Sequence, residues 1–127
     1  KDYNARAMIS LSKKYLEGKG FKKNPKAAAS LMEKAARSSG SSRSHLGLMY
    51  LNGEGVDKDS EKAFRLFKDA AEAGDSTAML QLGYMYRDGT AVESDVKMYR
   101  YYVRMSADRG NRDALDLVAK WNSRKKH

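Results

Sequence analysis

Apolar residues return every three or four positions along this chain, in short runs that glycines interrupt. Over residues 76–88, Ala78, Leu82 and Tyr86 are spaced four apart and Met85 lies beside them, which places all four on one face of a helix. After Asp59 a second stripe has the same period: Ala63, Leu66, Phe67, Ala70 and Ala71. Valine and isoleucine are scarce, whereas alanine, lysine and leucine are common. The pattern therefore favours amphipathic helices over strands.

The helical pattern repeats at intervals of 35 and 36 residues. One tyrosine marks each unit, and the three are Tyr15, Tyr50 and Tyr86. Each tyrosine follows a leucine by four positions and precedes a glycine by three; the glycines are Gly18, Gly53 and Gly89. A repeat of this length is typical of solenoids in which every unit is a pair of antiparallel helices.

Residues at fixed places in each unit predict where the two helices end and begin. The glycines stand just beyond the last apolar position of the first helix, where a left-handed residue is favoured. Gly53 and Gly55 are accordingly expected to adopt backbone conformations that other residues disfavour. The second helix of each unit should begin after an N-cap residue, namely Asn24, Asp59 or Asp95. Pro25 suits the first helical position, because its missing N–H has no partner there.

The sequence thus predicts an all-α fold, a solenoid of about three helical hairpins plus a C-terminal helix. A chain of 127 residues fits one domain, over residues 1–127. We expect repeats at about 4–38, 39–73 and 74–109, a partial repeat or capping helix at about 110–122, and a basic tail at 123–127. Trp121 should cover the end of the stack, and the methionines are expected to fill gaps in the alanine-rich core.

The second unit carries the most complete motif. It reads Leu46-Gly47, Tyr50, Gly53-Glu54-Gly55-Val56, Asp59, Lys62-Ala63, Phe67, Ala70-Ala71 and Gly74. Over about residues 4–122 the chain resembles the Sel-one-like repeat family, a relative of the tetratricopeptide repeat. The resemblance implies a right-handed α-solenoid whose first helices line a concave side. It also implies a non-catalytic adaptor that binds proteins, in bacteria often in envelope or secretion-linked processes.

Several positions depart from the family pattern. Ser12 and Phe21 replace a glycine and a valine in the first unit. In the third unit Ala91 replaces a glycine, and Tyr99 stands where alanine is usual. Many members of the family carry one disulfide per repeat, whereas this chain has no cysteine. We expect the helix around Tyr99 to pair with its neighbours in a variant way.

The face of each first helix that lies opposite its core residues forms the candidate binding surface. Three helices contribute nine residues to it: Ser10, Lys13, Glu17, His45, Leu48, Asn52, Gln81, Tyr84 and Asp88. Leu48 and Tyr84 are the expected apolar anchors, since aliphatic and aromatic side chains dominate interface energies. The alternative is that these two side chains contact the next repeat.

The sequence does not favour an enzyme, and we expect neither a cofactor nor a metal. His45 has Met49 rather than a ligand or base four positions on, and the other histidine, His127, is the last residue. Without cysteine there is no thiol nucleophile. The serines at 38–44 lack a Gly-x-Ser-x-Gly turn, and Gly18-Lys19-Gly20 is too short for a phosphate loop.

The net charge of +9 is unevenly distributed. Residues 1–37 sum to +7, residues 38–96 to −4, and residues 97–127 to +6. The basic ends leave two alternatives to a concave-face adaptor: an immunity or antitoxin-like protein that grips an acidic toxin, or a binder of nucleic acid or anionic lipid. The acidic middle argues against nucleic acid, and so does the lack of aromatic residues among the basic clusters. A protein or peptide, acidic in one reading, is thus the expected partner.

The location of the protein stays open at this stage. No stretch approaches the roughly 18 apolar residues of a membrane span. The start at Lys1 shows no signal-peptide pattern, and its lack of methionine indicates a trimmed or mature chain. We expect a monomer of bacterial origin, in the periplasm, outside the cell or in the cytoplasm.

Overall fold

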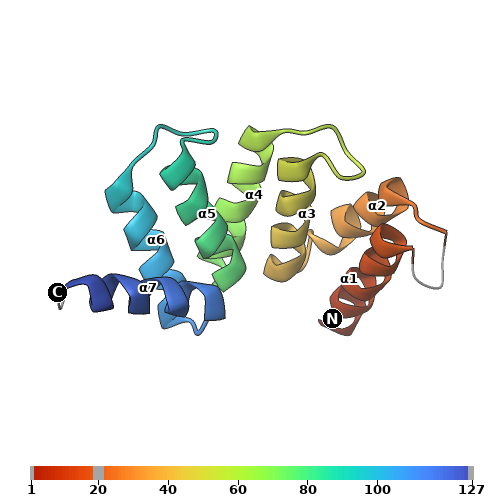
Figure 1. Cartoon of the computed structure of the whole chain (residues 1–127). Coiled ribbons are helices and arrows are strands. Elements are labelled where there is room, and N and C mark those ends of the chain that lie inside the picture. The colour runs from red at the N-terminus through yellow and green to blue at the C-terminus, as the bar shows by residue number, and fades with distance from the viewer. Residues whose placement is uncertain (1, 19–21, 126–127) are drawn as a thin grey trace.

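The computed structural model of the protein describes residues 2–18 and 22–125. Within these residues the chain forms seven α-helices and no strand (Figure 1). They are α1 (Asp2–Glu17), α2 (Pro25–Ala35), α3 (Gly40–Asn52), α4 (Ser60–Glu72), α5 (Ser76–Asp88), α6 (Val96–Asp108) and α7 (Arg112–Lys125). The predicted all-α repeat solenoid is confirmed. Gly20 and Phe21 of the first loop, and Lys126 and His127 of the tail, lie outside the described residues.

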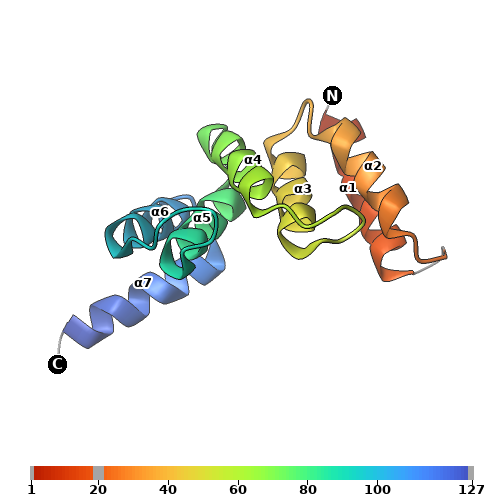
Figure 2. The same cartoon turned by 90° about the horizontal axis from the view of Figure 1, so that it is seen from above.

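The helices form hairpins that stack in chain order. α1 pairs with α2, α3 with α4 and α5 with α6, and α7 packs on α6. Figure 2 shows these pairs in a row, with α1 and α2 at one end and α7 at the other. Successive first helices also contact one another, α1 with α3 and α3 with α5. Helices on the inside of a curved stack lie closest together, so the first helices form its inner side.

The predicted caps are present at both ends of the hairpins. The side chains of Asn24, Asp59 and Asp95 accept hydrogen bonds from backbone N–H groups in the first turns of α2, α4 and α6. Gly53 and Gly89 end α3 and α5 in the left-handed conformation, with φ of 69° and 71°. Both features satisfy backbone groups that a helix end leaves without partners.

The core is divided into three clusters along the stack. The first lies among α4, α5 and α6 around Phe67 and Leu82, with partly buried residues of α3 packed against it. The second joins the first two hairpins around Met32 and Leu46, and the third joins α5, α6 and α7 around Val103. Four methionines are buried in these clusters, as predicted: Met32, Met49, Met79 and Met85. Each cluster spans neighbouring helices, so no hairpin buries its apolar face alone.

The C-terminal helix closes the last cluster. In α7, Ala114 is fully buried, and Leu117, Val118 and Trp121 pack around it. The Trp121 ring meets Tyr99 edge-on at 5.6 Å between centroids. α7 continues to Lys125, so residues 123–125 of the expected tail are helical. Basic residues near a helix C-terminus interact favourably with its dipole, which supports this extension.

Candidate partner-binding site

A pocket opens on the inner side of the stack between α1 and α3. Its volume is about 210 Å³. Four of the nine predicted residues line it: Lys13, His45, Leu48 and Asn52. The other lining residues are Ile9, Ser12, Leu16, Met32, Met49 and Glu54. The structure thus brings part of the predicted surface of α1 and α3 together around one hollow.

The floor of this pocket is apolar and its rim is polar. Met32 and Met49 are buried core residues of the second cluster, and Leu16 packs against them. The buried Ser12 hydroxyl donates a hydrogen bond of 3.1 Å to the Ala28 carbonyl, so it presents no unsatisfied donor to the pocket. Lys13, Asn52 and Glu54 are exposed at the rim. An apolar floor with a few polar groups around it is the usual composition of a ligand site.

His45 contributes a ring with one nitrogen already engaged. Its Nδ1 lies 2.8 Å from the Ser41 carbonyl oxygen. Because a carbonyl oxygen only accepts, this contact places the proton on Nδ1. The neutral ring then has Nε2 as an acceptor for a partner's N–H or O–H group.

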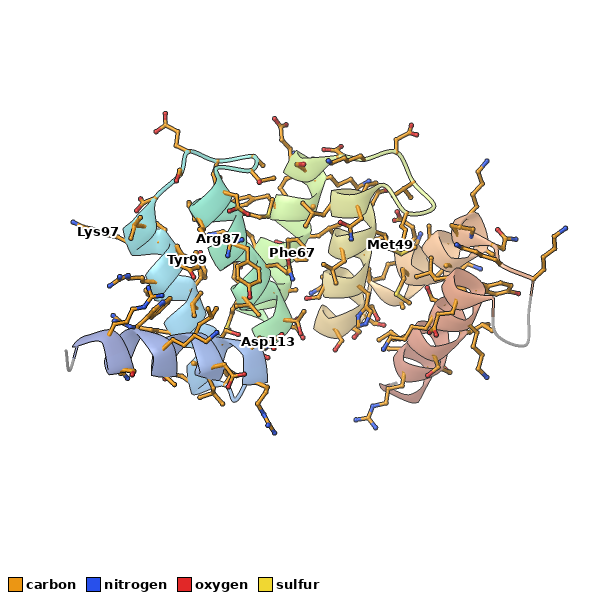
Figure 3. All side chains as sticks on the ribbon, viewed as in Figure 1. Met49, Phe67, Arg87, Lys97, Tyr99 and Asp113 are labelled. Atoms are coloured by element: carbon orange, nitrogen blue, oxygen red, sulfur yellow. The ribbon has the colours of Figure 1, made fainter. Side chains whose placement is uncertain are left out.

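Tyr84 occupies the same helical position as Leu48 but has different surroundings. It packs, half-buried, against the third cluster. The Arg87 guanidinium carbon lies 4.7 Å from the centre of the Tyr84 ring, within range of a cation–π interaction. Burial raises the pKa of the Tyr84 hydroxyl, and the Asp113 carboxylate on α7 adds to the rise. Figure 3 shows Arg87 and Tyr99 side by side, with Asp113 below them. Tyr84 therefore contacts the helices that follow it.

The remaining predicted residues lie outside the pocket. Gln81 is half-buried on α5, and Ser10 and Glu17 are exposed on α1. Asp88 is exposed at the end of α5, where it accepts hydrogen bonds of 2.8 and 3.2 Å from Arg87. This guanidinium holds the pKa of the Asp88 carboxyl below its ordinary value. The nine residues thus line three helices without forming a single pocket.

Sequence reasoning missed two parts of this surface. The pocket also includes Ile9, Leu16 and Glu54, which are neighbours of predicted positions on the same helices or in the next loop. It also missed the stack of Arg87 with Tyr84 and Tyr99. The unusual tyrosine at position 99, where alanine is typical, was the signal for that stack.

The structure contains no obvious centre for chemistry in the part of the chain that it describes. Over residues 2–18 and 22–125, no three acidic or histidine side chains gather closely enough to hold a metal ion. No helix in the same ranges is long and apolar enough to cross a membrane.

Comparisons with known structures show the same repeat architecture. A Sel1 repeat protein from Oxalobacter formigenes is 34% identical, with a TM-score of 0.81, over 87% of this chain and 45% of that protein. A protective antigen of uropathogenic Escherichia coli with an SLR fold is 28% identical, with a TM-score of 0.82, over 95% of this chain and 26% of the antigen. The chain thus spans less than half the length of either protein.

A third similar structure is close to this chain in length. Cysteine-rich protein B of Helicobacter pylori is 26% identical, with a TM-score of 0.71, over 91% of this chain and 90% of that protein. The family model of the Sel1 repeat matches this sequence three times, at residues 5–39, 41–75 and 76–111. These matches take in most of α1, α3 from its second residue on, and all of α2, α4, α5 and α6. The chain belongs to the Sel1 repeat family.

Proposed function

We propose that this chain is a non-catalytic scaffold that binds a protein or peptide on its concave face. Sel1 repeat proteins generally mediate protein–protein interaction. The observation that supports this proposal most directly is the pocket between α1 and α3, which lies on the inner row of helices and contains Leu48. The three similar structures come from bacteria, which supports a bacterial adaptor.

The size and lining of the pocket suit one apolar side chain of a partner. A buried apolar cavity of about 150 Å³ is large enough for benzene, and this pocket measures about 210 Å³. A leucine or phenylalanine inserted there would contact Leu48 and Met49. Lys13, His45 and Asn52 at the rim would then hydrogen-bond the partner's backbone, which fixes its direction.

The other predicted residues extend this surface along the stack. Gln81 and Asp88 on α5 lie one hairpin further, and Ser10 and Glu17 lie on α1. Tyr84 presents only its exposed edge, because the rest of the ring packs on the third cluster. We place the main anchor at Leu48, with the polar residues as a specificity-setting rim.

The test is a selection of short displayed peptides against the purified protein. Peptides that bind the pocket should lose about 1–3 kcal/mol of binding free energy on Leu48→Ala, as truncated anchors commonly do. Leu115→Ala is the matched control, because Leu115 is a leucine on α7 that is 44% exposed. Fluorescence anisotropy would measure both affinities. Binders that tolerate Leu48→Ala and His45→Ala as well as the control would overturn the proposal.

A further inference from the structure

A second hollow runs along α6, in the third hairpin, away from the pocket between α1 and α3. One stripe of α6 lines its main part, about 420 Å³ in volume: Lys97, Arg100, Tyr101, Arg104, Met105 and Asp108. A smaller hollow of about 170 Å³ lies beside it, between α4 and α6, lined by Lys68, Ala71, Glu72, Tyr101, Tyr102 and Met105. Tyr101 and Met105 line both, so the two form one continuous groove, called here the α6 groove. No residue of a first helix lines it.

The α6 groove carries unneutralised positive charge. Lys97, Arg100 and Arg104 lie one turn apart along the helix, and none of them forms an ion pair with any residue in the described part of the chain. The guanidinium carbons of Arg100 and Arg104 lie 5.3 and 5.9 Å from the centre of the Trp121 ring. Stacking on an aromatic ring restricts an arginine while leaving its N–H donors available.

The floor of the groove is aromatic and accessible. Tyr101 is 54% exposed and meets the buried Tyr102 edge-on, at 5.2 Å between ring centroids. The Lys68 ammonium donates a hydrogen bond of 3.4 Å to the Tyr102 hydroxyl across the gap between α4 and α6. An exposed tyrosine among fixed cations is the composition of a recognition surface, since tyrosine and arginine are the residues most enriched in binding hot spots.

From this geometry we infer that the α6 groove binds an acidic peptide segment that carries an aromatic or aliphatic side chain. The carboxylates would pair with Lys97, Arg100 and Arg104, and the apolar side chain would lie on Tyr101 and Met105. The cations span residues 97–104, only about 10 Å of helix, and Asp108 and Glu72 occupy the far end. This short run with acids at one end matches the length of a few carboxylates better than that of a continuous polyanion.

The experiment selects random displayed peptides against the Leu48→Ala variant, so that binders of the α1–α3 pocket are not enriched. We expect peptides with two or more acids and one apolar residue. Synthetic copies should bind about tenfold more weakly when Lys97→Glu and Arg104→Gln are combined, because one exposed charge pair is lost and a second is reversed. Tyr101→Ala should weaken the same peptides severalfold.

The matched control is the pair Lys26→Glu and Lys34→Gln on α2, which lowers the net charge by the same three units at exposed positions. The affinity of this control variant for the peptides should stay within about twofold of that of the unmodified protein. Circular dichroism of both double variants separates lost binding from lost folding.

The inference would be overturned if the selected peptides carried no acids, or if both double variants weakened binding equally. A short oligonucleotide that binds at least as tightly would assign the groove to polyanions instead. None of these results tests binding at the α1–α3 pocket, so the proposal for that pocket and the inference for the α6 groove can fail independently.

Discussion

The second and third hairpins share one backbone plan and differ in what they present to a partner. α3 and α5 each have 13 residues and end at a left-handed glycine, and α4 and α6 each begin after an aspartate cap. On this common frame Leu48 corresponds to Tyr84, and Ala63 to Tyr99. Caps and glycines set the frame, whereas a few substitutions decide which surface is open.

The difference at Leu48 and Tyr84 comes from their neighbours. Leu48 packs on the first cluster and also lines the open pocket between α1 and α3. In the third hairpin the Arg87 guanidinium carbon lies 4.7 and 5.9 Å from the centres of the Tyr84 and Tyr99 rings. The Trp121 ring of α7 meets Tyr99 edge-on. Aromatic and cationic groups therefore fill the space beside Tyr84, whereas the corresponding leucine borders a pocket.

The loops of the two hairpins also differ in packing, but in the opposite sense: the loop of the second hairpin makes a close contact, and that of the third is open. Gly55 has a φ of 79°, and a Cβ built on it would lie 2.1 Å from the Pro25 carbonyl oxygen. Ala91, its counterpart, has a φ of 64° and is exposed. The second hairpin therefore packs its loop on the preceding hairpin through a glycine that cannot be replaced, whereas the third tolerates an alanine.

The largest expected effect is on the free energy of unfolding, when the glycine and the alanine of these two loops are exchanged. Gly55→Ala should destabilise the protein by about 3 kcal/mol or more, because the methyl group meets backbone that cannot move aside. Ala91→Gly should raise stability by about 1 kcal/mol, since it relieves a left-handed alanine without a new contact. Urea unfolding followed by circular dichroism measures both. Equal effects of the two changes would show that the loops do not differ as described.

A smaller effect separates Tyr84 from Leu48. Tyr84→Ala should lower the free energy of unfolding by about 2–3 kcal/mol, because it removes the contacts to Arg87 and the third cluster. Leu48→Ala should lower it by less, since the smaller leucine side chain packs on the first cluster but also borders an open pocket. Thermal melts of the two variants, with Leu115→Ala as the control, measure the difference. A larger loss for Leu48→Ala would reverse the assignment of packing and binding roles.

The frame of these hairpins could be predicted because it depends on local sequence. Asp59 and Asp95 cap their helices through their own side chains, and Gly53 and Gly89 end theirs through backbone freedom. Such rules need no knowledge of distant residues. The caps of α3 and α5 went unpredicted, although Ser39 and Asp75 follow the same chemistry. Asp75 also accepts a hydrogen bond from Ser44, one hairpin earlier, which periodicity alone does not indicate.

The open and filled surfaces could be predicted only in part. Helical periodicity placed both Leu48 and Tyr84 on the face opposite the core residues of their helices, because it depends on spacing alone. Whether space remains beside them depends on Tyr99, Arg87 and α7, which come from other elements. The expectation that the basic clusters lack aromatic residues was wrong, because Tyr99 and Tyr101 alternate with Lys97, Arg100 and Arg104 along α6. That error is why the α6 groove escaped prediction.

Salt should distinguish the two hairpins by a still smaller amount. Raising the salt concentration from about 0.05 to 0.2 M should change the affinity of a Leu48-pocket peptide by less than about twofold, because apolar contacts are not screened. The affinity of an acidic peptide for the α6 groove should fall about fivefold, since exposed charges attract it. Fluorescence anisotropy titrations at both concentrations provide the comparison. A similar salt dependence of the two peptides would contradict the distinction between an apolar and a cationic site.

The smallest expected effect is on the pH dependence of stability, because the end of α5 has an ion pair that the end of α3 lacks. Asp88 accepts two hydrogen bonds from Arg87, whereas α3 has Leu51 and Asn52 at the matching places. The pKa of the Asp88 carboxyl is lowered by this arginine, so the folded pKa lies below the unfolded value of about 4. The contact therefore stabilises the fold above that pH, and its contribution is lost as the pH falls through the folded pKa. Asp88→Asn should be slightly less stable than the unmodified protein at pH 7, and the difference should disappear once the pH has fallen below the lowered pKa of Asp88. Urea unfolding across this range measures the difference, with Glu93→Gln, an exposed carboxylate of the following loop, as the control. A difference that persists unchanged in acid would show that the ion pair does not link this end of α5 to pH.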